Sequence, residues 1–284
     1  MRNFTFKGLF LAAMFMVLGS LAIQAADDGL ITKQITVKLE KAGTLPDRIG
    51  STKRDKITNL KIIGEINGTD LCVIREMAGR NYYGSESDGK LAILDLSETK
   101  IVSGGGRYLY DDYLRDYFYT HDNEFGSRTF YNCSGLTSLS LPSGITSIGW
   151  EAFSGCSGLT SLILPSSLTS IDREAFSGCS GLTSIYVYAE KLPNMKSDVF
   201  DGCDAKKCTV YVPKGTYDDY WLSEFGYFEN IVEFEATGIN NVITSNDAKE
   251  LSRYSLNGQR LSAPTKGLNL VKYSDGSVKK VAVQ

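Results

Sequence analysis

A segment that repeats every 23 residues constrains this chain more than any other feature. The hexapeptide Ser-Gly-Leu-Thr-Ser-Leu at residues 134–139 recurs at 157–162 and, ending in Ile, at 180–185. A second motif, Phe-x-x-Cys, starts at four points spaced 23, 23 and 24 residues apart, namely Phe130, Phe153, Phe176 and Phe200. Equivalent residues at a fixed period occupy equivalent places in successive structural units, and one such unit cannot bury its own apolar side chains. The chain is therefore predicted to stack its repeats into a solenoid.

The repeats carry the pattern Leu-x-x-Leu-x-Leu, which at this period is typical of leucine-rich repeats. Three clean copies occupy 136–141, 159–164 and 182–187, and three degenerate copies occupy 57–62, 91–96 and 207–212. We expect a leucine-rich-repeat solenoid whose six strands stack in a parallel β ladder, followed by a small β hairpin or sandwich tail. Each end of the array needs a cap, because a terminal repeat would otherwise expose its leucines.

Strand geometry divides each repeat into inward and outward positions. The first, fourth and sixth positions face the core, so the third and fifth face outward on one ribbon of surface. These candidate ligand-binding positions are Asn59, Lys61, Ile93, Asp95, Ser138, Ser140, Ser161, Ile163, Ser184, Tyr186, Thr209 and Tyr211. Ile163, Tyr186 and Tyr211 have no structural need to be exposed, which favours binding; ordinary β propensity on a half-exposed strand is the alternative.

The repeat units at 152–162 and 175–185 closely resemble the BspA-type leucine-rich repeat, and the stretch 210–217, ending at 230–233, resembles the closing segment of that family. The resemblance covers roughly residues 30–235. It implies an exported protein, secreted or held on the outer surface of a Gram-negative bacterium. Several members of the family are described as adhesins, so the implied partner is a host matrix protein, a glycan or another bacterial surface. A structural surface component without a specific ligand is the alternative.

Two insertions interrupt the array, at 63–90 and 97–130, where repeat spacing grows from 23 residues to 34 and 45. Eight of the 16 tyrosines lie between residues 82 and 131. Tyrosine offers a large apolar area and a polar tip at low entropic cost, which suits recognition. The further candidate binding residues are Tyr108, Tyr110, Tyr113, Tyr117 and Tyr119. The alternative, which we favour because a terminal repeat must cover its leucines, is that these aromatics fold back to cap the solenoid.

The cysteines of the Phe-x-x-Cys motif hold the same place in successive turns. Cys133, Cys156 and Cys179 should stack as buried free thiols, because parallel Cβ vectors make a disulfide torsion awkward. Cys203 and Cys208, five residues apart in a polar turn, are the most plausible disulfide in an exported chain. No Cys-x-x-Cys pair occurs, so we predict no zinc site.

Composition limits the remaining function classes. The net charge of −3 leaves no excess of positive charge for phosphates, so nucleic acid is not an expected partner. A single histidine, His121, nearly removes metal sites and histidine-dependent catalysis. A glycan hydrolase could use the carboxylates near His121, which are Asp111, Asp112, Asp116 and Glu124, but a solvated acidic loop looks the same. We therefore predict no catalytic residue, no metal and no cofactor.

The N-terminus carries the pattern of a secretory signal peptide over residues 1–25. Arg2 and Lys7 precede an apolar or small run of 16 residues, which is short for a membrane anchor. No transmembrane segment is expected after its removal. Residues 26–56 would form an N-terminal cap, and 57–235 the solenoid, with 207–235 as its closing segment.

Residues 236–284 lack the leucine pattern and are predicted to form a β tail. One hairpin is expected about Asn257-Gly258, and a second, joining 268–273 to 278–283, about Asp275-Gly276. This pattern resembles the C-terminal sorting domains of the type-nine secretion route, which implies recognition at the outer membrane. A β cap packed against the solenoid is the alternative.

Overall fold

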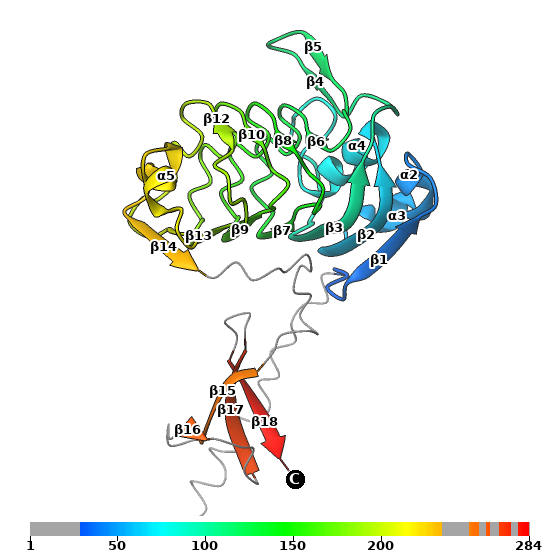
Figure 1. Ribbon diagram of the computed structural model, residues 1–284. Helices are drawn as coiled ribbons and strands as arrows, with labels where there is room; N and C mark the ends of the chain where they lie inside the picture. Colours follow the sequence, from blue (N-terminus) through cyan, green and yellow to red (C-terminus); the bar gives the residue numbers. More distant parts are fainter. Residues whose placement is uncertain (1–28, 235–249, 256–259, 262–266, 274–277, 284) are drawn as a thin grey trace, which may run out of the picture.

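The computed structural model describes residues 29–234, 250–255, 260–261, 267–273 and 278–283. The predicted signal peptide lies outside these residues. Within the described part of the chain, no helix is long and apolar enough to cross a membrane. Residues 29–234 form a coil of stacked turns whose strands run side by side along one face (Figure 1).

The strand face holds eight parallel strands in two sheets of four. The first sheet has the order β1 (Ile35–Leu39), β2 (Asn59–Ile66), β3 (Ile93–Ile101) and β7 (Ser138–Ser140). The second has the order β9 (Ser161–Leu164), β11 (Ser184–Val187), β13 (Thr209–Pro213) and β14 (Asn230–Phe234). The six predicted strands are confirmed. β1 and β14 extend the array by one strand at each end.

The predicted parallel ladder is confirmed, and at one point it divides into two sheets. β7 and β9 are not paired as strands, although the backbone N–H of Thr160 still donates to the carbonyl of Thr137 at 3.3 Å. The stack of turns therefore continues across the gap. A second ladder of two-residue strands runs along the other side of the coil (Figure 1). Its strands are β6 (Glu124–Phe125), β8 (Ser147–Ile148), β10 (Ser170–Ile171) and β12 (Asn194–Met195).

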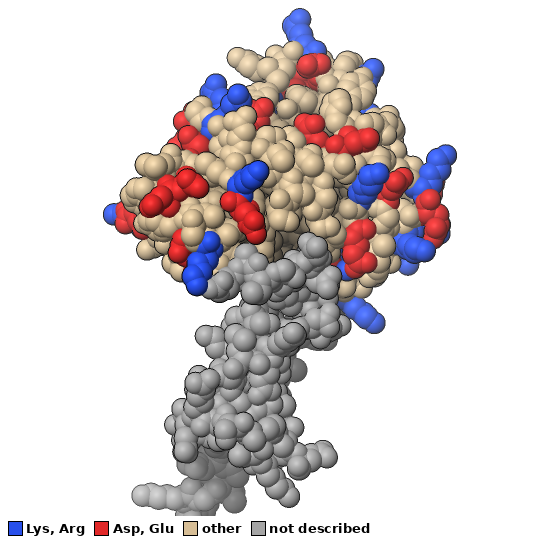
Figure 2. All heavy atoms as spheres, viewed as in Figure 1, with Lys and Arg blue, Asp and Glu red and all other residues tan. Residues whose placement is uncertain are grey.

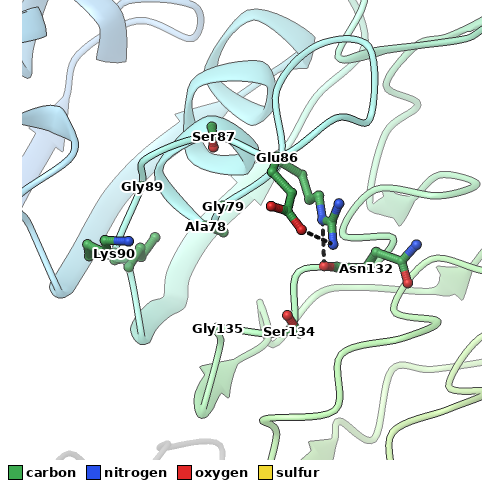
Figure 3. A pocket seen from close by; sticks show the side chains of 11 residues that line it. Ala78, Gly79, Glu86, Ser87, Gly89, Lys90, Asn132, Ser134 and Gly135 are labelled. Carbon is green, nitrogen blue, oxygen red and sulfur yellow. Dashed lines mark hydrogen bonds and ion pairs between the residues drawn. The ribbon is translucent and has the colours of Figure 1, made fainter.

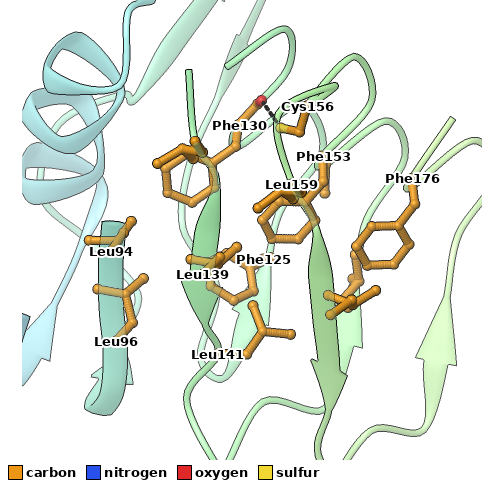
Figure 4. Close-up of a cluster of buried hydrophobic side chains, with 14 of the residues drawn as sticks. Leu94, Leu96, Phe125, Phe130, Leu139, Leu141, Phe153, Cys156, Leu159 and Phe176 are labelled. Carbon is orange, nitrogen blue, oxygen red and sulfur yellow. Dashed lines mark hydrogen bonds between the residues drawn. The ribbon is translucent and has the colours of Figure 1, made fainter. Parts of the chain in front are cut away.

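The core lies between the two ladders. The rings of the Phe-x-x-Cys motif stack on one another, with centroids 5.6 Å apart for Phe130 and Phe153, 5.3 Å for Phe153 and Phe176, and 5.8 Å for Phe176 and Phe200. The leucines of the repeats fill the space beside them (Figure 4). All inward positions of the three clean repeats are buried, which confirms the predicted orientation of the repeat.

The predicted thiol ladder is present. Two of its S–H groups donate to the carbonyl of the phenylalanine in the previous repeat, from Cys156 to Phe130 at 3.1 Å (Figure 4) and from Cys179 to Phe153 at 3.2 Å. Cys203 continues the ladder with a 3.4 Å hydrogen bond to Phe176. The predicted disulfide between Cys203 and Cys208 is wrong, because both are free thiols. Cys203 directs its sulfur along the solenoid to the previous turn instead of toward Cys208.

The ends of the solenoid are closed by short helices. α2 (Leu45–Arg48) and α3 (Ser51–Arg54) follow β1, while α5 (Tyr217–Trp221) and the 3-10 helix η1 (Glu224–Tyr227) lie near β14. At that end Phe225 and Phe228 place their rings 5.1 Å from Phe200, the last of the phenylalanine stack. The aromatic column is thus capped by aromatic rings.

The two insertions contribute one helix and one hairpin. Helix α4 (Gly68–Met77) begins at a capping box, in which Asn67 accepts from Thr69 and Asp70 accepts from the backbone of Asn67. The second insertion forms an antiparallel hairpin of β4 (Leu109–Asp111) and β5 (Asp116–Phe118). In Figure 1 this hairpin projects away from the body of the solenoid.

The tail forms one four-stranded antiparallel sheet of order β16-β15-β17-β18. Its strands are β15 (Glu250–Ser255), β16 (Arg260–Leu261), β17 (Gly267–Tyr273) and β18 (Val278–Val283). The two predicted pairings, β15 with β16 and β17 with β18, are confirmed. The turns expected at Asn257-Gly258 and Asp275-Gly276 lie outside the described residues.

Candidate functional site

The base of the β4–β5 hairpin is anchored in the solenoid. Tyr108, which the sequence suggests as a binding residue, is fully buried and donates its hydroxyl to the carbonyl of Ser127 at 2.7 Å. It belongs to the core, and it cannot reach a ligand. Arg128 of the first turn forms an ion pair with Asp111 of the hairpin and a second with Glu151, at 2.5 Å. The buried Tyr108 and these partly buried ion pairs hold the hairpin on its base.

The two insertions meet at this hairpin. The backbone N–H of Tyr110 donates to the carbonyl of Tyr82 at 2.9 Å, which joins the loop after α4 to strand β4. A row of rings follows, with centroid distances of 5.1 Å from Tyr82 to Tyr83, 6.2 Å from Tyr83 to Tyr110 and 4.8 Å from Tyr110 to Tyr117. We call Tyr82, Tyr83, Tyr110, Tyr117 and Tyr119, together with Arg107, the tyrosine platform.

The platform and the hairpin tip are open to solvent. The exposed fractions are 60% for Tyr83, 40% for Tyr117, 47% for Tyr119 and 91% for Tyr113 at the tip. The interpretation that these aromatics fold back to cap the solenoid is therefore wrong for Tyr113, Tyr117 and Tyr119. Of the five tyrosines predicted as binding residues in this insertion, only Tyr108 is buried in the core.

Arg107 is held on the platform by contacts with tyrosine side chains. Its guanidinium carbon is 3.7 Å from the centroid of the Tyr117 ring, and its Nε–H donates to the hydroxyl of Tyr119 at 2.8 Å. Hydrogen bonds to Tyr119 and Tyr82 raise the pKa of Arg107 above its ordinary value. Arg107, Tyr82 and Tyr83 are site residues that were not predicted from the sequence. The sequence does show the pair Tyr82 and Tyr83 in the first insertion, but it contains no indication that the two insertions are in contact.

The predicted outward ribbon is brought together by the strand register. In the first sheet Asn59 aligns with Ile93 and Ser138, and Lys61 aligns with Asp95 and Ser140. In the second sheet one row holds Ser161, Ser184 and Thr209, and the other holds Ile163, Tyr186 and Tyr211.

The charged side chains of this ribbon already form ion pairs within the protein. The Nζ of Lys61 lies 3.2 Å from Asp95 and 2.6 Å from Glu98, and both Lys61 and Asp95 are buried. The hydrogen bond that Lys61 donates to Glu98 is the main cause that raises the pKa of Lys61. These groups satisfy one another, so they offer little to a ligand.

The opposite end of the ribbon is apolar and aromatic. The rings of Tyr186 and Tyr211 stack at 4.5 Å with an interplanar angle of 6°. Ile163 and Val232 lie on the same row, at exposed fractions of 38% and 46%, and Phe234 meets Tyr186 edge-on. We call these five residues the strand-face patch. It is a second candidate surface.

A pocket of about 370 Å³ lies between the first insertion and the first clean repeat (Figure 3). The Nε–H of Arg80 donates to the carbonyl of Asn132 at 2.8 Å, and Arg80 also contacts Glu86. Lys90 and Ser134 complete its polar lining. The sequence analysis did not predict this pocket, because its walls are far apart in the chain.

Two of the carboxylates proposed for a hydrolase are engaged by other partners. Asp111 is committed to Arg128, and Asp116 accepts from the backbone of Tyr117 at 2.7 Å. Within the described residues no group of three or more His, Cys, Asp or Glu side chains could hold a metal ion. Figure 2 shows acidic and basic side chains interspersed over the visible face, with no broad area of one sign.

The parallel ladders and the repeats give residues 29–234 the fold of a leucine-rich-repeat solenoid. Residues 119–220 match the family model of the BspA type leucine rich repeat region in six copies, so this segment is similar to the repeats of that family. The chain is also similar to a leucine-rich repeat protein from Bacteroides ovatus, at 21% identity and a TM-score of 0.35. That match covers 72% of this chain and 42% of the other, so the chain spans about two fifths of its length. No curated protein matches.

Proposed function

We propose that this chain is an exported, adhesin-like binding module that recognises a protein or a glycan through the tyrosine platform. The BspA-type repeats favour a surface binding or structural role, and the signal-like segment at residues 1–25 favours export from a Gram-negative bacterium. The partner would be host matrix or another bacterial surface. A sorting role for the tail, residues 236–284, belongs to the same proposal.

The observation that carries this proposal is the exposure of several tyrosines on a firmly anchored hairpin. The solenoid does not need these rings for its core, since the phenylalanine and leucine columns fill it. Rings that are exposed yet fixed by neighbouring rings lose little entropy when a partner covers them. Such rigid aromatic anchors supply much of the affinity at recognition surfaces.

The test is the double variant Tyr117→Ala with Tyr119→Ala, made in the full chain. Retention on host matrix and bacterial surface extracts should fall about tenfold or more, since an anchoring side chain is worth about 2 kcal/mol. The thermal midpoint should not change, because both side chains are exposed. A midpoint that drops while binding per folded molecule stays constant would contradict the proposal.

A matched control lies at the far end of the solenoid. Tyr217 and Trp221 of α5 are a stacked pair with exposed fractions of 40% and 46%, close to those of Tyr117 and Tyr119. Their double replacement by Ala removes a similar aromatic area from a different place. Retention should remain unchanged. Equal losses in the two double variants would indicate a general stickiness of exposed aromatic rings, and the proposal would fail.

The strand-face patch is the second candidate, favoured by its parallel Tyr186–Tyr211 stack. If Tyr186→Ala with Tyr211→Ala abolishes retention and the platform variant does not, the binding surface is the strand face. A purely structural surface role makes a different prediction, namely concentration-dependent self-association of the full chain, which sedimentation would detect.

A further inference from the structure

The tyrosine platform contains one cation that the protein itself does not neutralise. Among the residues that the structure describes, Arg107 forms no ion pair, whereas Arg128, on the same hairpin base, forms two. Arg107 is exposed, and only Tyr side chains contact its guanidinium by hydrogen bonding or ring stacking. An unpaired guanidinium is ordinarily a mobile surface group with little binding specificity.

Arg107 is instead held in one orientation. The Tyr117 ring lies under its plane at 3.7 Å, and the Tyr119 hydroxyl accepts from Nε at 2.8 Å. Tyr119 engages Nε and Tyr82 takes a further hydrogen bond, so the remaining N–H groups of the guanidinium are left to donate. A guanidinium that is fixed in advance presents a planar fork to a carboxylate without a further ordering cost.

We infer that Arg107 is the anion subsite of the tyrosine platform, and that it takes the carboxylate of an acidic sugar, so that the ligand is a glycan containing uronic or sialic acid residues. This inference rests on the proposed function. It narrows the ligand to one class and names Arg107 as the residue that recognises the charge.

The surroundings favour a carboxylated glycan over a densely charged ligand. The platform offers one cation beside several rings, which matches a polymer whose charges are separated by bulky sugar rings. The exposed carboxylates of Asp112 and Asp116 lie on the same hairpin. They would repel an acidic peptide tract or a heavily sulfated polymer, because each of these brings several negative charges to a small area.

The rest of the platform supplies what a sugar needs. The exposed ring of Tyr83 presents an apolar face to the C–H groups of a pyranose ring, and the hydroxyls of Tyr83 and Tyr117 can donate to and accept from sugar hydroxyls. The row from Tyr83 through Tyr110 to Tyr117, with steps of 6.2 and 4.8 Å, extends over more than one ring. It therefore fits an oligosaccharide better than a single sugar.

The experiment uses the full chain on immobilised polygalacturonate, hyaluronan and polysialic acid, each beside its methyl-esterified or carboxyl-reduced form. We expect retention on at least one carboxylated polymer and loss of retention on its neutral form. Arg107→Gln should weaken binding about tenfold or more, as expected for loss of a charge-assisted hydrogen-bonded pair. Arg115→Gln is the matched control, because Arg115 is exposed in the turn of the same hairpin; it should change affinity less than about twofold.

Three results would overturn the inference: no retention on any of the three carboxylated polymers, equal retention of the neutral forms, or equal losses from Arg107→Gln and Arg115→Gln. None of these results touches the proposed function. That proposal fails separately, if the double variant Tyr117→Ala with Tyr119→Ala is retained on host matrix and bacterial surface extracts as well as the unaltered chain is.

Discussion

At the scale of single residues, inward and outward side chains of the repeat strands have opposite surroundings. Leu162 of β9 is enclosed by the turns on both sides, while Ser138 of β7 is exposed on the outward ribbon. We expect Leu162→Ala to lower the free energy of unfolding by about 2–5 kcal/mol, and Ser138→Ala to change it by less than about 0.5 kcal/mol. Urea titrations of both variants provide the measurement. Losses of equal size would contradict the inside–outside register.

The thiol ladder makes stability depend on pH in the alkaline range. Burial raises the pKa of Cys133 to about 11 and that of Cys203 to about 12. In the unfolded chain a thiol loses its proton above about pH 8.5, whereas the folded chain keeps it up to the raised pKa. The buried, protonated Cys133 thiol therefore makes its full contribution to the free energy of unfolding below about pH 8.5. This contribution is lost as the pH rises toward 11.

The variant Cys133→Ala isolates one rung of this ladder. Its free energy of unfolding should fall less steeply between about pH 8.5 and pH 10, by up to about 1.4 kcal/mol per pH unit. Urea titrations across this range, compared with the unaltered chain, measure the two slopes. An unchanged slope would show that the Cys133 thiol is not protected by burial.

At the scale of elements, the periodic part of the fold follows from the sequence and the rest does not. Strands β9 and β11 repeat the same six-residue pattern, so neighbouring turns fix their register. β1 and β14 lack that pattern. They join the ladder only because a neighbouring strand, β2 or β13, has an unpaired edge. This pairing depends on residues that are distant in the chain, so no local sequence motif predicts it.

The tyrosines show the same limit at the candidate site. Tyr108 and Tyr117 have the same residue type and belong to the same insertion, yet one is buried and the other is 40% exposed. The difference arises from contacts to distant parts of the chain, such as the carbonyl of Ser127 that accepts from Tyr108. Composition could place a recognition surface in this insertion, but it could not assign each ring to the core or to the platform.

The β4–β5 hairpin should depend on its ion pair with the solenoid. Asp111→Asn removes the Asp111 partner of Arg128 and leaves the pair between Arg128 and Glu151 in place. We expect faster amide hydrogen exchange in residues 109–118, with little change in the thermal midpoint, because the hairpin carries few core residues. Unchanged exchange in these residues would mean that the buried Tyr108 alone fixes the hairpin.

At the scale of the whole molecule, the solenoid is a rigid support that presents two separate candidate surfaces. The strand-face patch lies on strands β9 to β14 of the second sheet, and the tyrosine platform lies on the hairpin and the loop after α4. Repeat arrays of this kind keep such surfaces at fixed separations, since each turn contacts only its neighbours. A partner could therefore be bound by one surface without reaching the other.

Photocrosslinking in the full chain tests most directly whether the tyrosine platform contacts the partner. A photoreactive phenylalanine analogue replaces Tyr83 or Tyr117 in one set of proteins, and Tyr186 or Tyr211 in another. We predict that partner material from host matrix or bacterial surface extracts is crosslinked from the platform positions and not from the strand face. Crosslinking from Tyr186 or Tyr211 alone would contradict this prediction and place the binding surface on the strands.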